Sequence, residues 1–566
     1  MRQLSIKTIA FLGLSGLITS QLQAQDTYLG PEMPETRLIS RIEARVRHLM
    51  ADGTDASMPV SRRELVNFLS NYEREARVGS IPLSRVDEFN INRAIALSGE
   101  WFENSAGESG FVSSRRPILK YFYQKQTDLI NVETGDFFLS VNPVLYFQAN
   151  YEMDRGSFTR NIRGAEVRAR IADRIGLYTM LADNQEKLAG YMRPWVDAHR
   201  KQLPEQHLAV LTGENFDIFM ARGYVDVGII KKKLNLSFGY DKHHVGYGMR
   251  SLVYGYNAAP TTFMRLRAKW RNFQYESLIT EQMPNYEGRA DVLFPRRYAA
   301  VHQLNYTPKR WLSVGIFEST MLSQSKKTAI TAFVPVIGWQ SIARQAGNTE
   351  ANNAWGLQFK AIPTRDVQVY GQAFFDKLDL GSIGQGSWEN RYAFQLGLKY
   401  FDVLSVANLD GQLEWNLVRP FTYLADNDSS TSFTHYNQPL AHPLGNNFSE
   451  IIGNLRYQPS PLWTIEGRAV YAVRGVPEAG KNYGTSIYQL ATGRTEGDKA
   501  YPFLVGEKKA SLWGNLNVAY ELRPNLFLEV GGTLVPDADK LPNSGNVIGY
   551  GAIRWNIGRT LYDYRY

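Results

Sequence analysis

The chain has 566 residues, of which 44% are hydrophobic and 13% aromatic, with 47 Gly, 24 Pro and no Cys. The absence of cysteine excludes disulfides, thiolate nucleophiles, cysteine-ligated zinc and a lipid-modified cysteine. The net charge of +8 comes from 63 basic and 55 acidic residues spread along the whole chain, which does not indicate a nucleic-acid-binding surface. The high aromatic content favours strands and interfaces.

Residues 1–24 have the pattern of a secretory signal peptide. Arg2 and Lys7 precede an apolar stretch from 9 to 18, and Ala24 supplies a small residue before Gln25. The apolar stretch is too short to cross a hydrocarbon core ~30 Å thick, and no run of about 18 apolar residues follows it. We therefore expect a secreted mature chain that is either soluble or a membrane β-barrel.

Residues of about 33 to 100 carry helical signals. Ser61 and Ser84 each lie three residues before an acid, Glu64 and Asp87 respectively, which is the spacing of an N-terminal capping box. Apolar residues at helical spacing follow both serines. The pattern predicts two or three short helices.

After Gly107 the pattern changes to alternation with period two. In 393–400, for example, Phe394, Leu396 and Leu398 fall on one face of an extended chain and Lys399 falls on the other. The same alternation occurs in 262–270, 354–361 and 449–458. Each segment is predicted to be a strand with one apolar and one polar face.

The links between these strands fall into two length classes that alternate along the chain. The short links carry turn-forming residues and lie at 172–174, 231–233, 270–272, 308–310, 363–366, 401–404, 459–461 and 523–525. The long links are rich in Gly, Asn, Asp and Ser and include 183–214, 241–260, 320–353, 418–447 and 474–509. A soluble β-rich enzyme or lectin would also alternate, but its links need not sort by length.

The strand count is about 18, from near 137 to 547–558, and an even count with short turns at one end is typical of outer-membrane barrels. We predict an all-β transmembrane barrel over 111–566, a periplasmic helical region over 25–110, and both termini in the periplasm. Aromatic residues near the turns are predicted to form an interfacial girdle: Tyr306 and Trp311, Tyr457 and Trp463, Tyr520 and Phe527. The final Tyr562, Tyr564 and Tyr566 suit the aromatic C-terminus of barrels that the outer-membrane assembly machinery inserts.

No motif indicates catalysis. The stretch 475–482 nearly matches a phosphate-binding loop, but Asn482 replaces the required hydroxyl residue. The stretch 426–437 has the oxygen spacing of a calcium loop, but Thr431 and Asn437 stand where glycine and an acid are needed. No nucleophile elbow or paired-carboxylate motif stands out. We expect no enzyme activity, no cofactor and no metal.

The polar strand faces would line the lumen of the barrel. They place a set of basic residues there as candidate ligand-binding residues: Arg265, Arg267, Lys269, Lys360, Lys399, Arg456 and Arg554. A basic surplus in a confined aqueous space would attract anionic solutes such as acidic glycans. The same residues could instead form a cross-strand ion-pair lattice with acidic neighbours, and both interpretations stay open.

Two outer loops contain further candidates. His243 and His244 are adjacent, so in an extended chain they point to opposite faces, and Arg250 follows in the same loop. His435 and His442 lie seven residues apart in a stretch whose prolines and glycine favour a loop of fixed shape. A metal or catalytic role for these histidines is the alternative to a hydrogen-bonded loop.

The stretch 435–450, HYNQPLAHPLGNNFSE, resembles the signature of the gliding-motility protein RemB family of Bacteroidota outer-membrane proteins. That family is in turn similar to the capsule-assembly Wzi-type barrels. The residues of this stretch that we take as candidate site residues are His435, Tyr436, Asn437, Gln438, Pro439, His442, Pro443, Gly445, Asn447 and Phe448. DFFLSVNP at 136–143 and GYGMRSL at 246–252 also agree, and Asn446 departs from the alanine of the family pattern. The similarity covers roughly the whole mature chain.

The resemblance implies an 18-stranded barrel with a periplasmic helical region that assembles, attaches or organises surface polysaccharide without catalysis, with a link to gliding. The implied partners are outer-membrane lipid, an anionic surface polysaccharide and the barrel-assembly machinery, with no nucleic acid and a monomeric state. A diffusion porin and a motility or adhesion component are the alternatives.

Overall fold

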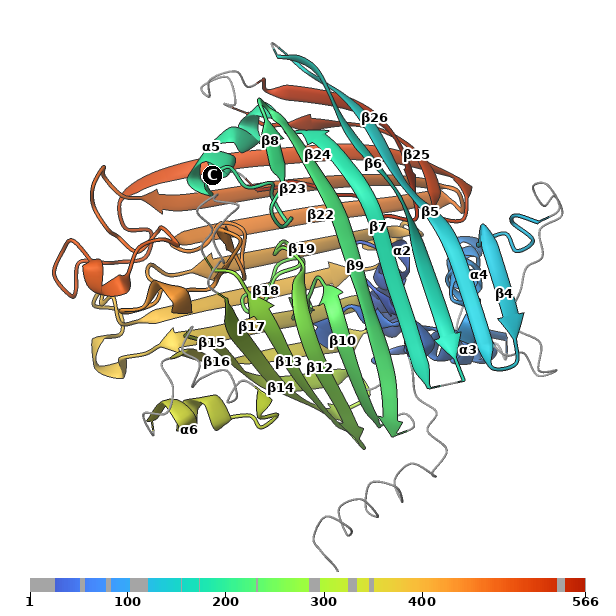
Figure 1. Ribbon diagram of the computed structural model, residues 1–566, viewed down its shortest axis with the longest axis horizontal. Helices are drawn as coiled ribbons and strands as arrows, with labels where there is room; N and C mark the ends of the chain where they lie inside the picture. The colour runs from blue at the N-terminus through green and yellow to red at the C-terminus, as the bar shows by residue number, and fades with distance from the viewer. Residues whose placement is uncertain are drawn as a thin grey trace, which may run out of the picture.

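The wall of the molecule is a closed antiparallel β-barrel of 18 strands (Figure 1). The structure is a computed structural model that describes residues 26–50, 56–77, 83–101, 121–153, 155–172, 174–230, 233–284, 296–323, 333–345, 351–536 and 545–564. The predicted signal peptide and the predicted boundary near residue 110 lie outside these residues.

The barrel begins with β5 and closes where β26 pairs with it. Its strands in chain order are β5 (Phe137–Glu152), β6 (Gly156–Ile171), β7 (Ile175–Lys187), β9 (Asn215–Ile230), β10 (Leu234–Asp241), β12 (Thr261–Trp270), β13 (Phe273–Gln282), β14 (Arg297–Lys309), β15 (Leu312–Leu322), β16 (Ala351–Thr364), β17 (Val367–Lys377), β18 (Arg391–Tyr400), β19 (Leu409–Val418), β22 (Phe448–Ser460), β23 (Trp463–Val476), β24 (Glu507–Arg523), β25 (Leu526–Leu534) and β26 (Val547–Trp555). Two short strands, β4 (Ile130–Thr134) and β8 (Val210–Thr212), pair with β5 and β9 respectively. The predicted count of about 18 strands is confirmed, and the first and last strands lie where they were predicted, near 137 and 547.

Alternation along each strand separates an apolar outer face from a polar inner face. In β18, Phe394, Leu396 and Leu398 are exposed on the outside, whereas the Gln395 and Lys399 side chains bond to groups inside the barrel. A closed barrel with a continuous apolar exterior is the form in which strands satisfy their backbone groups in lipid.

Short and long links between the strands lie at opposite ends of the barrel, as predicted. One end carries short links, at 172–174, 231–233, 271–272, 310–311, 365–366, 401–408, 461–462 and 524–525. The other end carries the long links, at 188–214, 242–260, 283–296, 323–350, 378–390, 419–447, 477–506 and 535–546, together with one short link at 153–155. We call these the short-turn end and the long-loop end.

Three helices, α2 (Pro34–Val46), α3 (Arg62–Arg77) and α4 (Arg85–Leu97), lie within the short-turn end of the barrel (Figure 1). The predicted capping box is present at α4, where Ser84 and Asp87 bond reciprocally to each other's backbone N–H. Ser61 likewise accepts the N–H of Glu64 at the start of α3. The helices share an apolar core with β1 (Tyr28–Leu29) and β3 (Val60–Ser61), which pair with each other. We call the described residues 26–101 the plug.

Small elements connect the plug to the loops. In the plug, β2 (Ser57–Met58) pairs with β11 (His244–Val245), which belongs to the long loop 242–260. That loop therefore reaches down the lumen. The remaining elements are β20 (Thr434–His435), β21 (Gln438–Pro439), α5 (Arg193–Ala198), α6 (Trp339–Gln345) and the single-turn 3₁₀ helices η3 (Gly99–Trp101), η4 (Gly190–Met192), η6 (Leu380–Ser382), η7 (Val403–Ser405), η8 (Ser429–Thr431) and η9 (Ala491–Gly493). In the part of the chain that the structure describes, every helix is too short or too polar to cross a membrane.

The tyrosines near the end of the chain do not lie on the last strand, although their pattern suited a barrel's aromatic end. β26 ends at Trp555 at the short-turn end, but residues 556–564 turn back through the lumen and finish beside α5 (Figure 1). The Tyr191 hydroxyl donates to the carbonyl of Tyr562 (2.7 Å), and the Tyr564 ring lies 5.8 Å from that of Trp195. The last described residues thus lie toward the long-loop end, because charged and aromatic partners inside the lumen hold them. We call 556–564 the tail.

The predicted aromatic girdle holds with one correction. Tyr306, Trp311 and Trp463 are exposed near the short turns, and the rings of Trp463 and Tyr520 lie 4.9 Å apart. Phe527 is instead buried on the lumen side beneath the Arg554 guanidinium, 4.5 Å from its ring. The alternation in β25 gives the outward positions to its neighbours.

Candidate functional site: a filled, basic lumen

The predicted lumen cations are mostly engaged with acidic or backbone partners. The side chains of Arg265 and Arg267 both pair with Glu276 on β13, at 3.6 and 2.7 Å. Arg267 also donates to the backbone carbonyls of Ser57 and Pro59 in the plug. These two residues therefore join the wall to the plug.

Other predicted cations of the wall also bond to the plug or to a neighbouring strand. Lys360 forms an ion pair with Glu43 of α2 at 3.0 Å, and neither side chain has exposed surface. Lys399 donates to the Ser40 hydroxyl at 2.9 Å. Arg554 pairs with Glu529 on the neighbouring strand at 2.7 Å. Lys269 lies at the short-turn end of β12.

The stretch 435–450 folds into a tight hairpin and a buried turn. β20 and β21 pair across Tyr436 and Asn437, whose φ angles of 47° and 57° form the turn. Nδ1 of His435 accepts the N–H of Met283 (3.1 Å) and its Nε2 lies 3.2 Å from the Pro260 carbonyl. Because both ring nitrogens are used, the imidazole is neutral with the proton on Nε2, and burial lowers its pKa to about 3.

Other candidate residues of this stretch tie neighbouring loops together. Gln438 donates to the carbonyls of Leu203 and Gln206, at 3.2 and 2.8 Å. The Asn447 amide donates to the carbonyls of Gly475 and Val505, at 2.8 and 2.9 Å. Pro439, Pro443 and Phe448 are buried, and Gly445 has a φ of +71° that favours glycine. These residues shape the loop layer.

Asn446, the departure from the family pattern, has its own bond. Its amide donates to the carbonyl of Thr422 at 2.8 Å. Asn446 thus adds a contact inside loop 419–447.

A charged chain joins three parts of the molecule. Nε2 of His442 lies 2.8 Å from Glu450, which pairs with Arg250 at 3.3 Å. Arg250 also pairs with Asp563 of the tail (2.8 Å), and Asp563 pairs with Arg468 on β23 (2.7 Å). The structure therefore brings the two predicted loop sites together and adds the tail, which sequence reasoning did not connect to them.

Charges and burial set the protonation states in this chain. Burial would raise the pKa of Asp563, but the guanidinium groups of Arg250 and Arg468 outweigh it and hold the pKa below its ordinary value. Burial lowers the pKa of His442 despite the nearby Glu450. Nδ1 of His442 accepts the N–H of Leu444 (3.2 Å), so the neutral ring donates from Nε2 to Glu450.

His243 and His244 do not converge on one site. Nδ1 of His243 accepts from Arg265 at 2.6 Å, while His244 lies in β11 against Met58 of the plug. Burial lowers the pKa of both histidines. Among the described residues, no group of three or more His, Asp or Glu could hold a metal ion.

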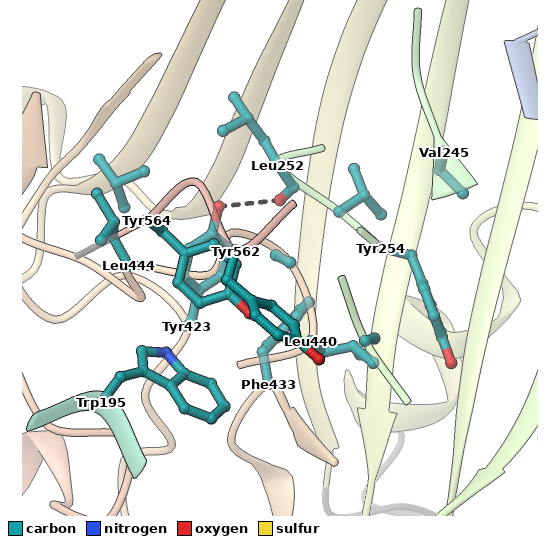
Figure 2. Packing of buried hydrophobic residues seen from close by; sticks show 14 of the residues in the cluster. Trp195, Val245, Leu252, Tyr254, Tyr423, Phe433, Leu440, Leu444, Tyr562 and Tyr564 are labelled. Carbon is teal, nitrogen blue, oxygen red and sulfur yellow. Dashed lines mark hydrogen bonds between the residues drawn. The ribbon is translucent and has the colours of Figure 1, made fainter. Parts of the chain in front are cut away.

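Three of the long loops, 188–214, 242–260 and 419–447, pack with the tail on a common apolar core inside the barrel mouth. Figure 2 shows Leu252 and Tyr254 of one loop, Tyr423 and Phe433 of another, and the tail rings beside Trp195 of α5. The Tyr423 hydroxyl donates to the Leu252 carbonyl at 3.0 Å (Figure 2). Loops so packed form a fixed cap.

A cavity of about 340 Å³ remains between the plug, the loops and the tail. Ten of its lining side chains are Arg or Lys and four are Asp or Glu. Lys399, Arg456 and Arg250 belong to the predicted set, and sequence reasoning did not predict Arg37, Arg41, Arg93, Arg222, Arg468 and Arg559 as site residues. Arg468 could have been found from its alternation with Glu466, but no sequence signal places the arginines of the plug and the tail inside the barrel.

The apolar exterior, the closed wall and the filled polar interior define an outer-membrane β-barrel fold. Wzi of Escherichia coli, described as an outer-membrane protein involved in group 1 capsule assembly and a carbohydrate-binding β-barrel, is similar in structure. The TM-score is 0.55 at 13% identity, over 95% of this chain and 100% of Wzi. OprD of Pseudomonas aeruginosa matches with a TM-score of 0.41 at 11% identity, over 74% of this chain and 94% of OprD. No protein-family model and no curated protein matches the sequence.

Proposed function

We propose that the chain is a non-catalytic outer-membrane barrel that attaches or organises surface polysaccharide. The observation that carries the proposal is the filled lumen: the plug, loop 242–260 and the tail occupy it. A lumen filled by buried ion pairs does not serve free diffusion of solutes, which leaves the surface of the fixed loops as the working face. Carbohydrate binding by Wzi, which has the same fold, supports a glycan as the ligand.

The proposal includes an orientation. The plug, the short turns and the start of β5 face the periplasm, and the long-loop end faces the outside. This is the usual arrangement of bacterial barrels, in which extracellular loops are longer than periplasmic turns. The barrel-assembly machinery and a monomeric state belong to the same proposal.

The motif residues act as scaffold in this proposal. His435, Gln438 and Asn447 are buried with their side chains bonded to neighbouring loops, so they shape the glycan-binding surface without touching the glycan. The exposed cations Lys499, Lys508 and Lys509 at the long-loop end supply contacts for an anionic glycan.

The test compares cell-bound with shed polysaccharide in a strain that lacks the gene and in the complemented strain. We expect shedding into the medium at unchanged total synthesis. Complementation with the Lys499→Gln, Lys508→Gln and Lys509→Gln triple variant should restore retention only partly. A matched triple variant at the short-turn end, Lys233→Gln, Lys309→Gln and Arg310→Gln, should restore it fully. Unchanged retention in the deletion strain contradicts the proposal.

A role in gliding is a second proposal, which rests on the resemblance of 435–450 to RemB proteins. The same strains test it as colony spreading. Normal spreading with shed polysaccharide separates the two roles.

A further inference from the structure

Four guanidinium groups gather around one carboxylate at the wall of the lumen cavity. Arg456 on β22 and Glu466 on β23 are cross-strand partners, and Arg468 lies on the same face two residues later. Arg37 of α2 donates to Glu466 at 2.7 Å, and Arg559 of the tail interacts with it electrostatically. All four arginines line the cavity.

Two of these four arginines form no ion pair among the described residues. Glu466 pairs with Arg37, and Asp563 pairs with Arg468. Among the described residues, Arg456 donates only to the amide oxygen of Gln458, at 3.3 Å, and is in no ion pair. Burial of this guanidinium is costly, and Arg37 and Arg93 repel it, while Glu466 and Asp410 attract it without forming an ion pair.

Arg559 is likewise in no ion pair among the described residues, although the carboxylates of Glu466 and Glu529 attract it electrostatically. Its Nη2 donates to the Asn515 amide oxygen at 2.9 Å, while its Nη1 is buried and has no hydrogen-bond partner in the described part of the chain. A buried guanidinium nitrogen without an acceptor is costly, so such a site favours a ligand that supplies one.

We infer that this cavity binds a small organic or inorganic anion through Arg456 and Arg559. Planar guanidinium groups bind carboxylate and phosphate oxygens through paired N–H groups, and both arginines line this cavity. The volume of about 340 Å³ is near the lower end of the ~300–1,000 Å³ range of ligand pockets, so the anion is the size of one acidic sugar or a sugar phosphate. The inference is independent of polysaccharide retention.

Calorimetry on the purified full chain in detergent tests this site. Sodium phosphate and sodium glucuronate are titrated at constant ionic strength, with glucose as the uncharged comparison. We expect at least one anion to bind and glucose not to bind. Phosphate alone would indicate a phosphate ester as the natural ligand, and glucuronate alone an acidic sugar.

Variants connect the binding to the two arginines. Arg456→Gln with Arg559→Gln should weaken binding at least tenfold, and Arg456→Lys with Arg559→Lys should weaken it less. Arg494→Gln, on an exposed loop where Arg494 pairs with Asp498, is the matched control and should bind as the wild type does. Each variant is first checked for barrel folding by its heat-modifiable migration in gels.

Two results would overturn the inference. One is that the wild-type protein binds neither anion, which needs no variant. The other is a folded glutamine variant that binds as tightly as the wild type. If the double variant does not fold, Arg559→Gln alone replaces it, because Arg559 lies on the tail outside the barrel wall.

Discussion

At the scale of single residues, buried histidines keep the loop cap in its shape. His435 uses both ring nitrogens to join Met283 and Pro260, two residues that lie at the ends of different strands. His435 can make both hydrogen bonds only as a neutral imidazole. A second proton, on Nδ1, would remove the acceptor of the Met283 N–H.

We predict that acid loosens this part of the cap. The unfolded imidazole takes up a proton near its ordinary pKa of 6.5, whereas burial keeps the folded one neutral down to about 3. The unfolded state therefore binds more protons below pH 6.5, and stability falls as the pH falls, by about 2 kcal/mol between pH 7 and pH 5. Hydrogen exchange of the amides of Met283 and 434–440, corrected for intrinsic rates, measures this loss.

His435→Gln supplies the control for that experiment. The variant has a less stable loop at pH 7 but a smaller difference between pH 7 and pH 5. Equal pH dependence in both proteins would show that His435 is not the titrating group.

The sequence predicted which side chains point into the barrel, but it did not predict which residues they pair with. Alternation placed Arg265, Lys360 and Arg554 on the inner face correctly. The partner of Lys360 is Glu43, 317 positions earlier, and no local pattern connects them. For these three residues the folded chain reveals acidic partners, which favour the ion-pair lattice over ligand binding.

At the scale of elements, α2 is held to the wall by the buried pair of Glu43 and Lys360. Glu43→Gln leaves Lys360 buried without its acid, which typically costs about 3–5 kcal/mol. We expect the plug to loosen and ion conductance in planar bilayers to rise above the low level of the wild type. Replacing both residues, as Glu43→Leu with Lys360→Met, should restore low conductance. A wide pore in the wild-type protein would contradict a filled lumen.

Elements with a local signal were predictable. The capping residues Ser61 and Ser84 marked two helix starts, and period-two alternation marked the wall. The sequence did not predict the two-residue strand pairs, β2 with β11 and β20 with β21, because such short strands have no periodicity. The sequence also carried no sign that loop 242–260 meets the plug, since that contact joins segments about 190 positions apart.

At the scale of the whole molecule, the two ends differ in what they present. The short-turn end holds the plug, and the long-loop end holds a cap in which most of 492–500 is exposed. Fold class was predictable at this scale because link length and strand count are global properties of the sequence. The path of the tail through the lumen could not be predicted, because its aromatic residues also fit the end of a strand.

The proposed orientation predicts a protease pattern. Trypsin added to intact cells should cut within 477–506, where Lys499 is exposed, and spare the plug arginines inside the lumen. Mass spectrometry of the fragments locates the cuts. Cutting at 477–506 only after the cells are permeabilised would show that the long loops face the periplasm.

The path of the tail decides where a label can be placed on this protein. Because Asp563 and its aromatic neighbours lie within the lumen, an epitope or purification tag fused directly after Tyr564 starts from inside the barrel. Such a fusion would be hidden from antibodies on whole cells and would strain the contacts of Asp563 with Arg250 and Arg468. A tag inserted in the exposed loop near Gly497 avoids both effects.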